Sequence, residues 1–219
     1  MEKEILNVNM AQLEKEVRLM ELKGLSMDAV KRELDRCEGA RFSVGFESEV
    51  GRLLVKGRVF FALNESTGRY GIEYYELSLP DSASALHPEY AFPCEPWLVI
   101  RLDEAVNLMR GRYIYRKPEI GAGFWIGLTA LRVMPSEGFV FIRSDFEVRE
   151  YLAETGMGGW LGLSGWVKLV DQLDRGHRCD LAVGVGSEMR VVKVEADPLA
   201  RRLKVMDRKG KEVDYISNS

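Results

Sequence analysis

The basic side chains near the end of the chain are the residues whose type and spacing point most directly to a chemistry. Six of them fall between positions 201 and 211, where Asp207 is the only acidic residue. Guanidinium and ammonium groups on one hairpin could follow the phosphates of DNA or RNA. The candidate nucleic-acid-binding residues, with one from the preceding predicted strand, are Lys193, Arg201, Arg202, Lys204, Arg208, Lys209 and Lys211. Alternatively, these charges protect an edge strand from aggregation. The sequence favours this alternative, because no aromatic residues lie between the basic ones to stack on the bases of a single strand.

Aromatic residues form a second candidate site. They flank the prolines of segment 80–96 and bracket the glycine-rich segment 156–165. Because aromatic side chains are enriched at the energetic centres of interfaces, we predict that they bind a protein partner. The candidate protein-binding residues are Tyr90, Phe92, Trp97, Trp160 and Trp166. The alternative, which stays open at this point, is that they cover small satellite cores beneath long loops.

Histidine and metal chemistry have little support in the sequence. The chain has two histidines, His87 and His177, and the second directly follows Gly176 at a predicted helix end. An imidazole there interacts favourably with the helix dipole, which is a structural role. His177 and Cys179 would supply only two of the three or four ligands that zinc needs. We therefore predict no metal site.

Carboxylates and glycines also give no clear catalytic motif. Asp145 and Glu147, and likewise Glu195 and Asp197, lie two residues apart on predicted strands and would share a face. That geometry could serve acid–base catalysis, but nothing nearby in the sequence separates the pKa values of the two groups. The glycine-rich segment lacks the G-K-[ST] ending of a phosphate-binding loop. We predict a non-enzymatic protein without a cofactor. An uncharacterised enzyme is the third hypothesis for its function, after protein binding and nucleic-acid binding.

The elements that carry these residues follow a pattern that occurs three times. An amphipathic stretch ends in a leucine shortly before a glycine, and strand-like runs follow it. The three endings are Leu34-Asp35-Arg36-Cys37-Glu38-Gly39, Leu108-Met109-Arg110-Gly111 and Leu173-Asp174-Arg175-Gly176. Predicted strands are 42–46, 52–63 and 69–79, then 113–115, 124–133 and 139–142, then 181–185, 190–196 and 201–206.

The predicted fold is therefore α+β, with three related units of a helix and an antiparallel meander. An extra helix with an apolar stripe over 10–20 precedes them, and the helices pack on one face of the sheet or sheets. Ser26, Asp103 and Ser164 are the expected helix N-caps. The proline-rich segment 80–96 is expected to be a surface crossover. The units are 1–97, 98–163 and 164–219, which we expect to form one compact body.

Composition and charge limit the class of partner and the compartment. The 219 residues are 46% hydrophobic and 30% charged, which is typical of a globular protein. With 31 basic and 34 acidic residues the net charge is -3, so no global field attracts a polyanion or an anionic membrane. Three widely spaced cysteines fit reduced thiols. No run reaches the length of a membrane span, so we expect a cytoplasmic protein without membrane association.

Two segments resemble a known family. Residues 102–115 are similar to the "EA-x-NLL-x-GR-x-V-x-K" segment of an uncharacterised protein family of Bacteroidetes associated with conjugative and mobilisable elements. Val194-Glu195-Ala196-Asp197-Pro198, followed by 203–207, resembles the "EANPQ…VNVYD" ending of that family. The resemblance implies the fold, a cytoplasmic location and a mobile-element context, and it transfers no site residue. The expected function is a non-enzymatic interaction module that binds a protein, with nucleic-acid binding as the alternative.

Overall fold

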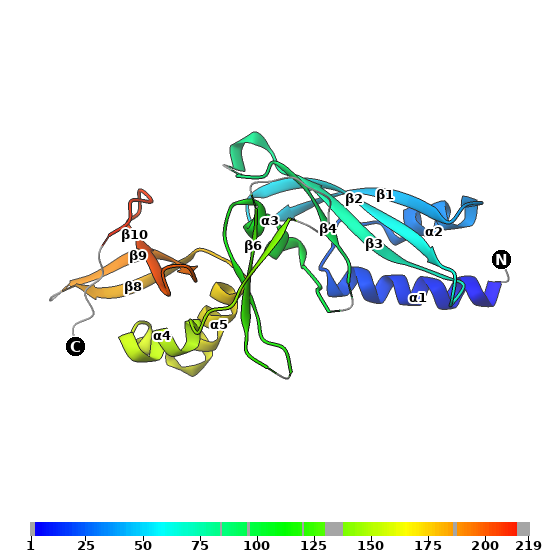
Figure 1. Cartoon of the computed structure of the whole chain (residues 1–219). Helices are drawn as coiled ribbons and strands as arrows, with labels where there is room; N and C mark the ends of the chain where they lie inside the picture. The colour runs from blue at the N-terminus through cyan, green and yellow to red at the C-terminus, as the bar shows by residue number, and fades with distance from the viewer. Residues whose placement is uncertain are drawn as a thin grey trace. The chain divides into compact units, whose positions relative to one another are not determined.

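The structure is a computed structural model that describes residues 3–83, 85–95, 97–119, 121–129, 138–185 and 188–213. It combines helices with three antiparallel sheets, so the predicted α+β class is confirmed (Figure 1). The sheets have the strand orders β1-β2-β3-β4, β5-β6-β7 and β10-β9-β8. Each is a meander that follows a helix in the sequence, although the first sheet has a fourth strand that the three-fold pattern does not predict.

The bounds of the elements are as follows. The helices are α1 (Lys3–Leu19), α2 (Met27–Arg36), α3 (Leu102–Met109), α4 (Val148–Thr155) and α5 (Gly162–Asp174), with short 3-10 turns η1 (Asp81–Ala83) and η2 (Gly159–Leu161). The first sheet contains β1 (Arg41–Val50), β2 (Leu53–Asn64), β3 (Arg69–Ser78) and β4 (Glu89–Pro93). The second contains β5 (Ile114–Arg116), β6 (Phe124–Leu128) and β7 (Phe139–Ile142). The third contains β8 (Cys179–Val185), β9 (Glu188–Asp197) and β10 (Arg202–Met206).

The chain divides into two compact units. Unit 1 contains the described residues up to Arg110 together with Gly138, and unit 2 contains Gly111–Thr129 and the described residues from Phe139 onward. The three predicted segments, 1–97, 98–163 and 164–219, do not coincide with these units. The reason is α3, which packs with β1 and β4 of unit 1, whereas the meander that follows it belongs to unit 2.

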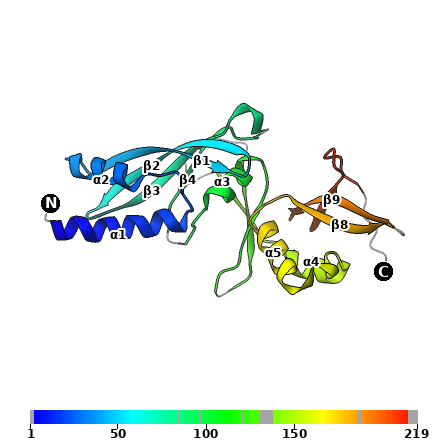
Figure 2. The ribbon, with the colours of Figure 1, turned by 180° about the vertical axis from the view of Figure 1, so that it is seen from behind.

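Unit 1 is built on the four-stranded sheet. Its helices α1 and α2 pack along β3 and β1, respectively (Figure 2). The predicted cap of α2 is confirmed, because the Ser26 hydroxyl accepts a hydrogen bond from the Ala29 backbone N–H at 3.3 Å. Phe61 and Tyr75 are fully buried in the core, and the Tyr75 hydroxyl donates to the Ile100 carbonyl at 2.9 Å. The buried side chains of these strands alternate with exposed ones, so the sheet turns one face to the helices.

The expectation of a surface crossover over 80–96 is wrong for its second half. Residues 89–93 form β4, which pairs with β3 at the edge of the sheet. Proline is compatible with an edge strand, since one side of that strand donates no ladder hydrogen bonds. Tyr90 and Phe92 point into the core, with exposed fractions of 8% and 0%. The Phe92 ring stacks on Tyr75 with 5.3 Å between the centroids.

Unit 2 encloses one hydrophobic core between its sheets and helices. Trp125 on β6 is fully buried there, and its indole N–H donates to the Phe146 carbonyl at 3.0 Å. In the third sheet, Val192 and Val194 are buried, while Lys193 and Glu195 lie on the opposite face. The alternation in the sequence therefore gives the correct buried face.

The predicted glycine stops explain how two of the helices end. Gly111 and Gly176 both have a φ of 76°, the left-handed conformation that glycine adopts readily. After α5, the His177 N–H reaches back to the Gln172 carbonyl at 2.9 Å. The two predicted N-caps further along the chain differ from the structure, because α3 begins at Leu102 and α5 at Gly162.

Helix α4 is not expected from the sequence. It places Glu147 at a helix N-cap and not on a strand. Residues 130–133 of the predicted strand 124–133 lie outside the described residues. No helix in the described parts of the chain has both the length and the apolar character needed to cross a membrane.

Candidate functional site

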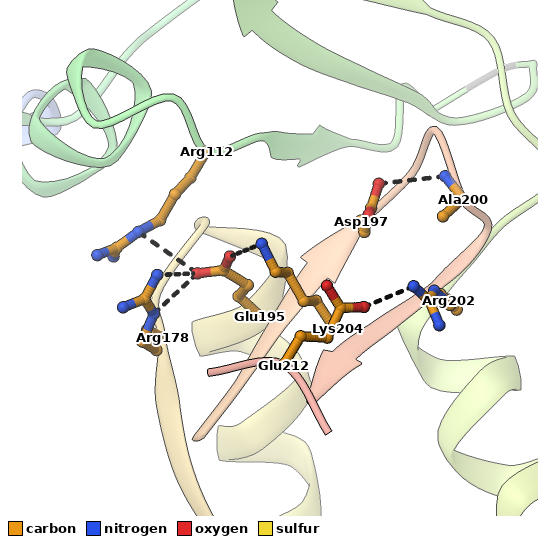
Figure 3. Close-up of polar contacts among 8 residues, drawn as sticks. All are labelled: Arg112, Arg178, Glu195, Asp197, Ala200, Arg202, Lys204 and Glu212. Carbon is orange, nitrogen blue, oxygen red and sulfur yellow. Dashed lines mark hydrogen bonds and ion pairs between the residues drawn. The ribbon is translucent and has the colours of Figure 1, made fainter. Parts of the chain in front are cut away.

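The predicted basic hairpin forms a charged cluster on the outer face of the third sheet. At its centre is the Glu195 carboxylate, which is only 14% exposed (Figure 3). Arg178 contacts it through two nitrogens at 2.8 Å, and Arg112 and Lys204 approach to 3.9 and 4.0 Å. Three cations therefore lie around one carboxylate. Arg112 and Arg178 are not among the predicted residues, because they lie outside the hairpin.

The other predicted basic residues fall into two groups. Arg202 pairs with Glu212 at 2.6 Å (Figure 3). Arg201 pairs with Asp145 at 3.2 Å, so each arginine has a counter-charge. Arg208, Lys209 and Lys211 lie on an exposed turn and make no ion pair with another described residue. Lys193 is half-buried on the same face as Glu195. The structure thus brings the predicted basic residues to one hairpin, but ion pairs neutralise part of their positive charge.

The predicted aromatic residues separate into buried and exposed ones. Tyr90 and Phe92 belong to the core of unit 1 and are not available to a partner. Trp97 in unit 1 is 66% exposed, and Trp160 in unit 2 is 47% exposed. Trp166 is partly buried against the unit 2 core, where the Arg149 guanidinium lies 5.5 Å from its ring centroid.

Trp160 belongs to an apolar stripe that runs onto α5. Leu163 and Val167 continue it at helical spacing, with exposed fractions of 81% and 47%. The opposite face of the same helix carries Leu169 and Leu173, which are buried in the core. Since a helix that packs one face normally presents polar residues on the other, this exposed apolar stripe is a candidate contact surface.

A groove lies along α5 beside the start of β8. It encloses about 430 Å³. Its lining residues are Leu161, Gly165, Lys168, Leu169, Gln172, His177, Arg178, Cys179, Asp180 and Leu181. In the described chain β8 pairs only with β9, so β8 is an edge strand with one unpaired side. The opposite edge differs, because residues 211–213 fold back along β10 and the Val213 N–H donates to the Val205 carbonyl at 2.9 Å.

The cysteine and histidine in this groove do not form a reactive pair. Burial raises the pKa of the Cys179 thiol to about 11, so the thiolate is scarce at neutral pH. The thiol lies 3.7 Å from the Gln172 side-chain oxygen. Among the described residues, no group of three or more His, Cys, Asp or Glu side chains could hold a metal ion.

A second, polar pocket of about 370 Å³ lies on another side of α5, between α5, the start of α4 and the end of β5. Its lining residues are Tyr115, Lys117, Glu147, Val148, Arg149, Val170 and Asp174. The Tyr115 hydroxyl donates to Glu147 Oε1 at 2.9 Å, and Lys117 Nζ lies 3.2 and 3.3 Å from the two oxygens of the same carboxylate. Glu147 is therefore fully engaged.

The two carboxyl groups of this polar pocket have opposite pKa displacements. Burial raises the pKa of Asp174 to about 7, with a further contribution from the negative charges of Asp171 and Glu147. Burial also acts on Glu147, but hydrogen bonds from Tyr115 and Lys117 outweigh it and lower that pKa. The sequence pairs considered above, Asp145 with Glu147 and Glu195 with Asp197, are not the pair that the fold brings to one cavity.

Comparison with known proteins identifies no relative. No protein-family model matches the chain, and neither a curated protein nor a solved structure matches it significantly. The resemblance to the Bacteroidetes family stays a prediction, and function is inferred from geometry.

Proposed function

We propose that this protein is a non-enzymatic, cytoplasmic protein-binding module. Its binding site is the groove between α5 and the free edge of β8, and its ligand is an extended acidic segment of a partner protein. The observation that carries the proposal is an unpaired edge strand that borders a groove of about 430 Å³. Recognition by strand addition uses this combination of an open edge and an adjacent groove.

The backbone of β8 would supply the affinity common to all ligands. An edge strand presents unpaired N–H and C=O groups, which another extended chain can satisfy. Each such hydrogen bond contributes about 0.5–1.5 kcal/mol net. Gly165, Lys168 and Gln172 on α5 form the other wall, so the ligand would lie between strand and helix.

Charge supports an acidic ligand. Lys168 and Arg178 line the groove as exposed cations, against Asp180 as the one acidic side chain of the lining. Arg178 also belongs to the cluster in which three cations share Glu195. A partner with Asp or Glu side chains would meet Lys168 and Arg178 in the groove, and complementary charges increase the association rate at low salt.

The exposed apolar side chains of Trp160 on η2 and of Leu163 and Val167 on α5 offer a second contact surface, because Leu163 and Val167 face another side of α5 from the groove-lining Leu169. Tryptophan is strongly enriched among residues that dominate binding energy. If the partner also covers this surface, Trp160→Ala should weaken binding by about thirtyfold, equivalent to about 2 kcal/mol. The predicted aromatic contact thus rests on Trp160, while Trp97 in unit 1 is a separate exposed residue.

The test is selection from a displayed library of random ten-residue peptides, followed by affinity measurement on the selected peptides. The proposal predicts enrichment of acidic sequences and a loss of at least about tenfold in affinity for Lys168→Glu with Arg178→Glu. The matched control is Lys31→Glu with Arg32→Glu, two exposed cations of α2 in unit 1. Enrichment without charge preference, or equal losses in both double variants, would contradict the proposal.

Nucleic-acid binding is the second candidate, because Arg208, Lys209 and Lys211 project from an exposed turn without an ion pair to any described residue. The turn is held by Asp207, whose Oδ1 accepts the backbone N–H groups of Lys209 and Lys211 at 2.8 and 2.9 Å. If these cations bind phosphates, exchanging all three for glutamine should reduce the slope of the logarithm of the binding constant against the logarithm of the salt concentration. The reduction should be about 0.9 for each phosphate that is no longer neutralised. Fluorescence anisotropy with labelled DNA and RNA measures this slope. An unchanged slope would exclude the turn as the binding surface.

A further inference from the structure

The polar pocket of unit 2 is independent of the peptide groove. Asp174 and Val170 of α5 line the pocket, whereas Gly165, Lys168 and Gln172 of the same helix line the groove. The pocket is assembled from three segments that lie far apart in the sequence: the end of β5, the start of α4 and the end of α5. A protein-binding role leaves its arrangement of charges unexplained.

We propose that this pocket binds a small zwitterion, an α-amino acid or a molecule with the same adjacent ammonium and carboxylate groups. The pocket offers a cation without an ion pair to the described residues at one side chain, and a carboxyl oxygen without a hydrogen-bond donor among them at another. Its volume of about 370 Å³ is near the lower end of the range typical of small-molecule sites. Val148 and Val170 supply apolar walls for the carbon skeleton of such a ligand.

Arg149 is the residue expected to bind the ligand carboxylate. Its guanidinium lies 5.5 Å from the Trp166 ring centroid, and it makes no ion pair with another described residue. Packing against an aromatic ring restricts the guanidinium while leaving its N–H groups for a planar, two-oxygen acceptor. Lys117 adds positive charge at the same pocket, although its ammonium is already paired with Glu147.

Asp174 is the residue expected to bind the ligand ammonium. Its Oδ1 atom is shielded from solvent and accepts no hydrogen bond from the described residues. A buried acceptor without a donor destabilises the folded chain, and a rotation of the carboxyl group that brings this oxygen to a ligand ammonium would offset the cost. Glu147 cannot take this role as readily, because Tyr115 and Lys117 already satisfy its oxygens.

The protonation state of Asp174 gives the proposal a distinctive readout. The charged groups facing Asp174 are Asp171 on its own helix, Glu147 and Arg149 at the start of α4, and Lys117 after β5. Because the pKa of Asp174 is about 7, part of the population is protonated at neutral pH. A bound ammonium favours the ionised carboxylate, so binding at pH 6.5 should release a proton. Calorimetry in buffers of different ionisation enthalpy measures that release.

The experiment is a titration of the full chain with the twenty L-amino acids, followed by amide chemical shifts of unit 2. For each amino acid that binds, the controls are the matching 2-hydroxy acid, which lacks the ammonium, and the matching amide, which lacks the carboxylate. The proposal predicts that each control binds at least about tenfold more weakly. It also predicts that Arg149→Gln and Asp174→Asn each weaken binding by about tenfold or more.

Matched substitutions separate a pocket effect from a general one. Glu154→Gln removes an exposed carboxylate near the end of α4, outside the pocket, and Arg36→Gln removes an exposed arginine from unit 1. Both should bind the amino acid as the parent chain does, and the amide spectra confirm that each variant is folded. If no amino acid shifts the resonances of residues 115–117, 147–149 and 170–174 at about 10 mM, the proposal is overturned. Equal binding of the hydroxy acids would overturn the assignment of Asp174.

Discussion

The exchange of Asp174 for asparagine tests the electrostatic account of the polar pocket. Burial displaces the pKa of this carboxyl from 3.8 to about 7, so the folded protein holds a proton that the unfolded chain has released. The stabilising contribution of that proton is fully present below about pH 4. It is lost as the pH rises through 7, because the charged carboxylate is then held without a hydrogen-bond donor on Oδ1.

The magnitude follows from the displacement of the pKa. A change from 3.8 to about 7 corresponds to about 4 kcal/mol, since each pKa unit is worth about 1.4 kcal/mol. Between pH 5 and pH 8 the folded protein loses only the share of this stabilisation that titrates above pH 5, which amounts to about 2–3 kcal/mol. Asparagine keeps the shape of the side chain but cannot ionise. Its advantage over aspartate should therefore grow by about 2–3 kcal/mol across this pH range.

The assay is urea unfolding of both proteins at a series of pH values, followed through amide resonances of unit 2. The control is Glu154→Gln, which removes an exposed carboxylate of α4 outside the polar pocket and should show no comparable gain in stability with rising pH. Parallel stability curves for the parent chain and Asp174→Asn would refute the reasoning. In that case the carboxyl would be solvated in the folded state, and the polar pocket would lack its unsatisfied acceptor.

Three further predictions concern packing and thiol chemistry. In Gly57→Ala the new methyl would lie 2.5 Å from the Phe46 ring and lower the melting temperature, whereas Gly39→Ala meets no atom within 4 Å and should leave it nearly unchanged. Trp125→Leu should reduce the free energy of unfolding by about 2–4 kcal/mol, measured by urea unfolding, because the variant lacks both the fully buried ring and its hydrogen bond; a change below about 1 kcal/mol would contradict its place in the core. Burial raises the pKa of the Cys179 thiol to about 11, so at pH 8 this thiol should react with iodoacetamide far more slowly in the folded chain than in the chain unfolded by urea. Equal rates in the two states would show that the thiol is exposed in the folded chain.

Local signals in the sequence are sufficient for most of the secondary structure. Ser26 is recognisable as a cap because its hydroxyl satisfies a helix N–H group nearby in the chain. Gly111 and Gly176 are recognisable as helix ends because glycine readily takes the left-handed conformation that such ends require. Alternation in the last strands identifies the correct buried face. Each of these signals depends on neighbours within a few residues.

The errors arise where tertiary context decides. Strand β4 is not predicted because the prolines of segment 80–96 argue against a central strand, and only the assembled sheet shows that β4 lies at an edge. The same error leaves Tyr90 and Phe92 as surface candidates, although both are buried in the core beside β3. The open edge of β8 and the pocket that joins Glu147 to Asp174 depend on strand order and on helix packing. No local pattern encodes either arrangement.

Hydrogen exchange of the β8 amides tests the central claim, strand addition at the groove, most directly. The measurement compares the chain alone with the chain bound to an acidic peptide obtained by selection. Strand addition predicts slower exchange at the outward-facing amides of residues 179–183. Exchange along β10 should change little, because residues 211–213 already cover the edge of that strand. Unchanged exchange along β8 in a complex that is demonstrably formed would contradict the account and place the binding surface elsewhere on the molecule.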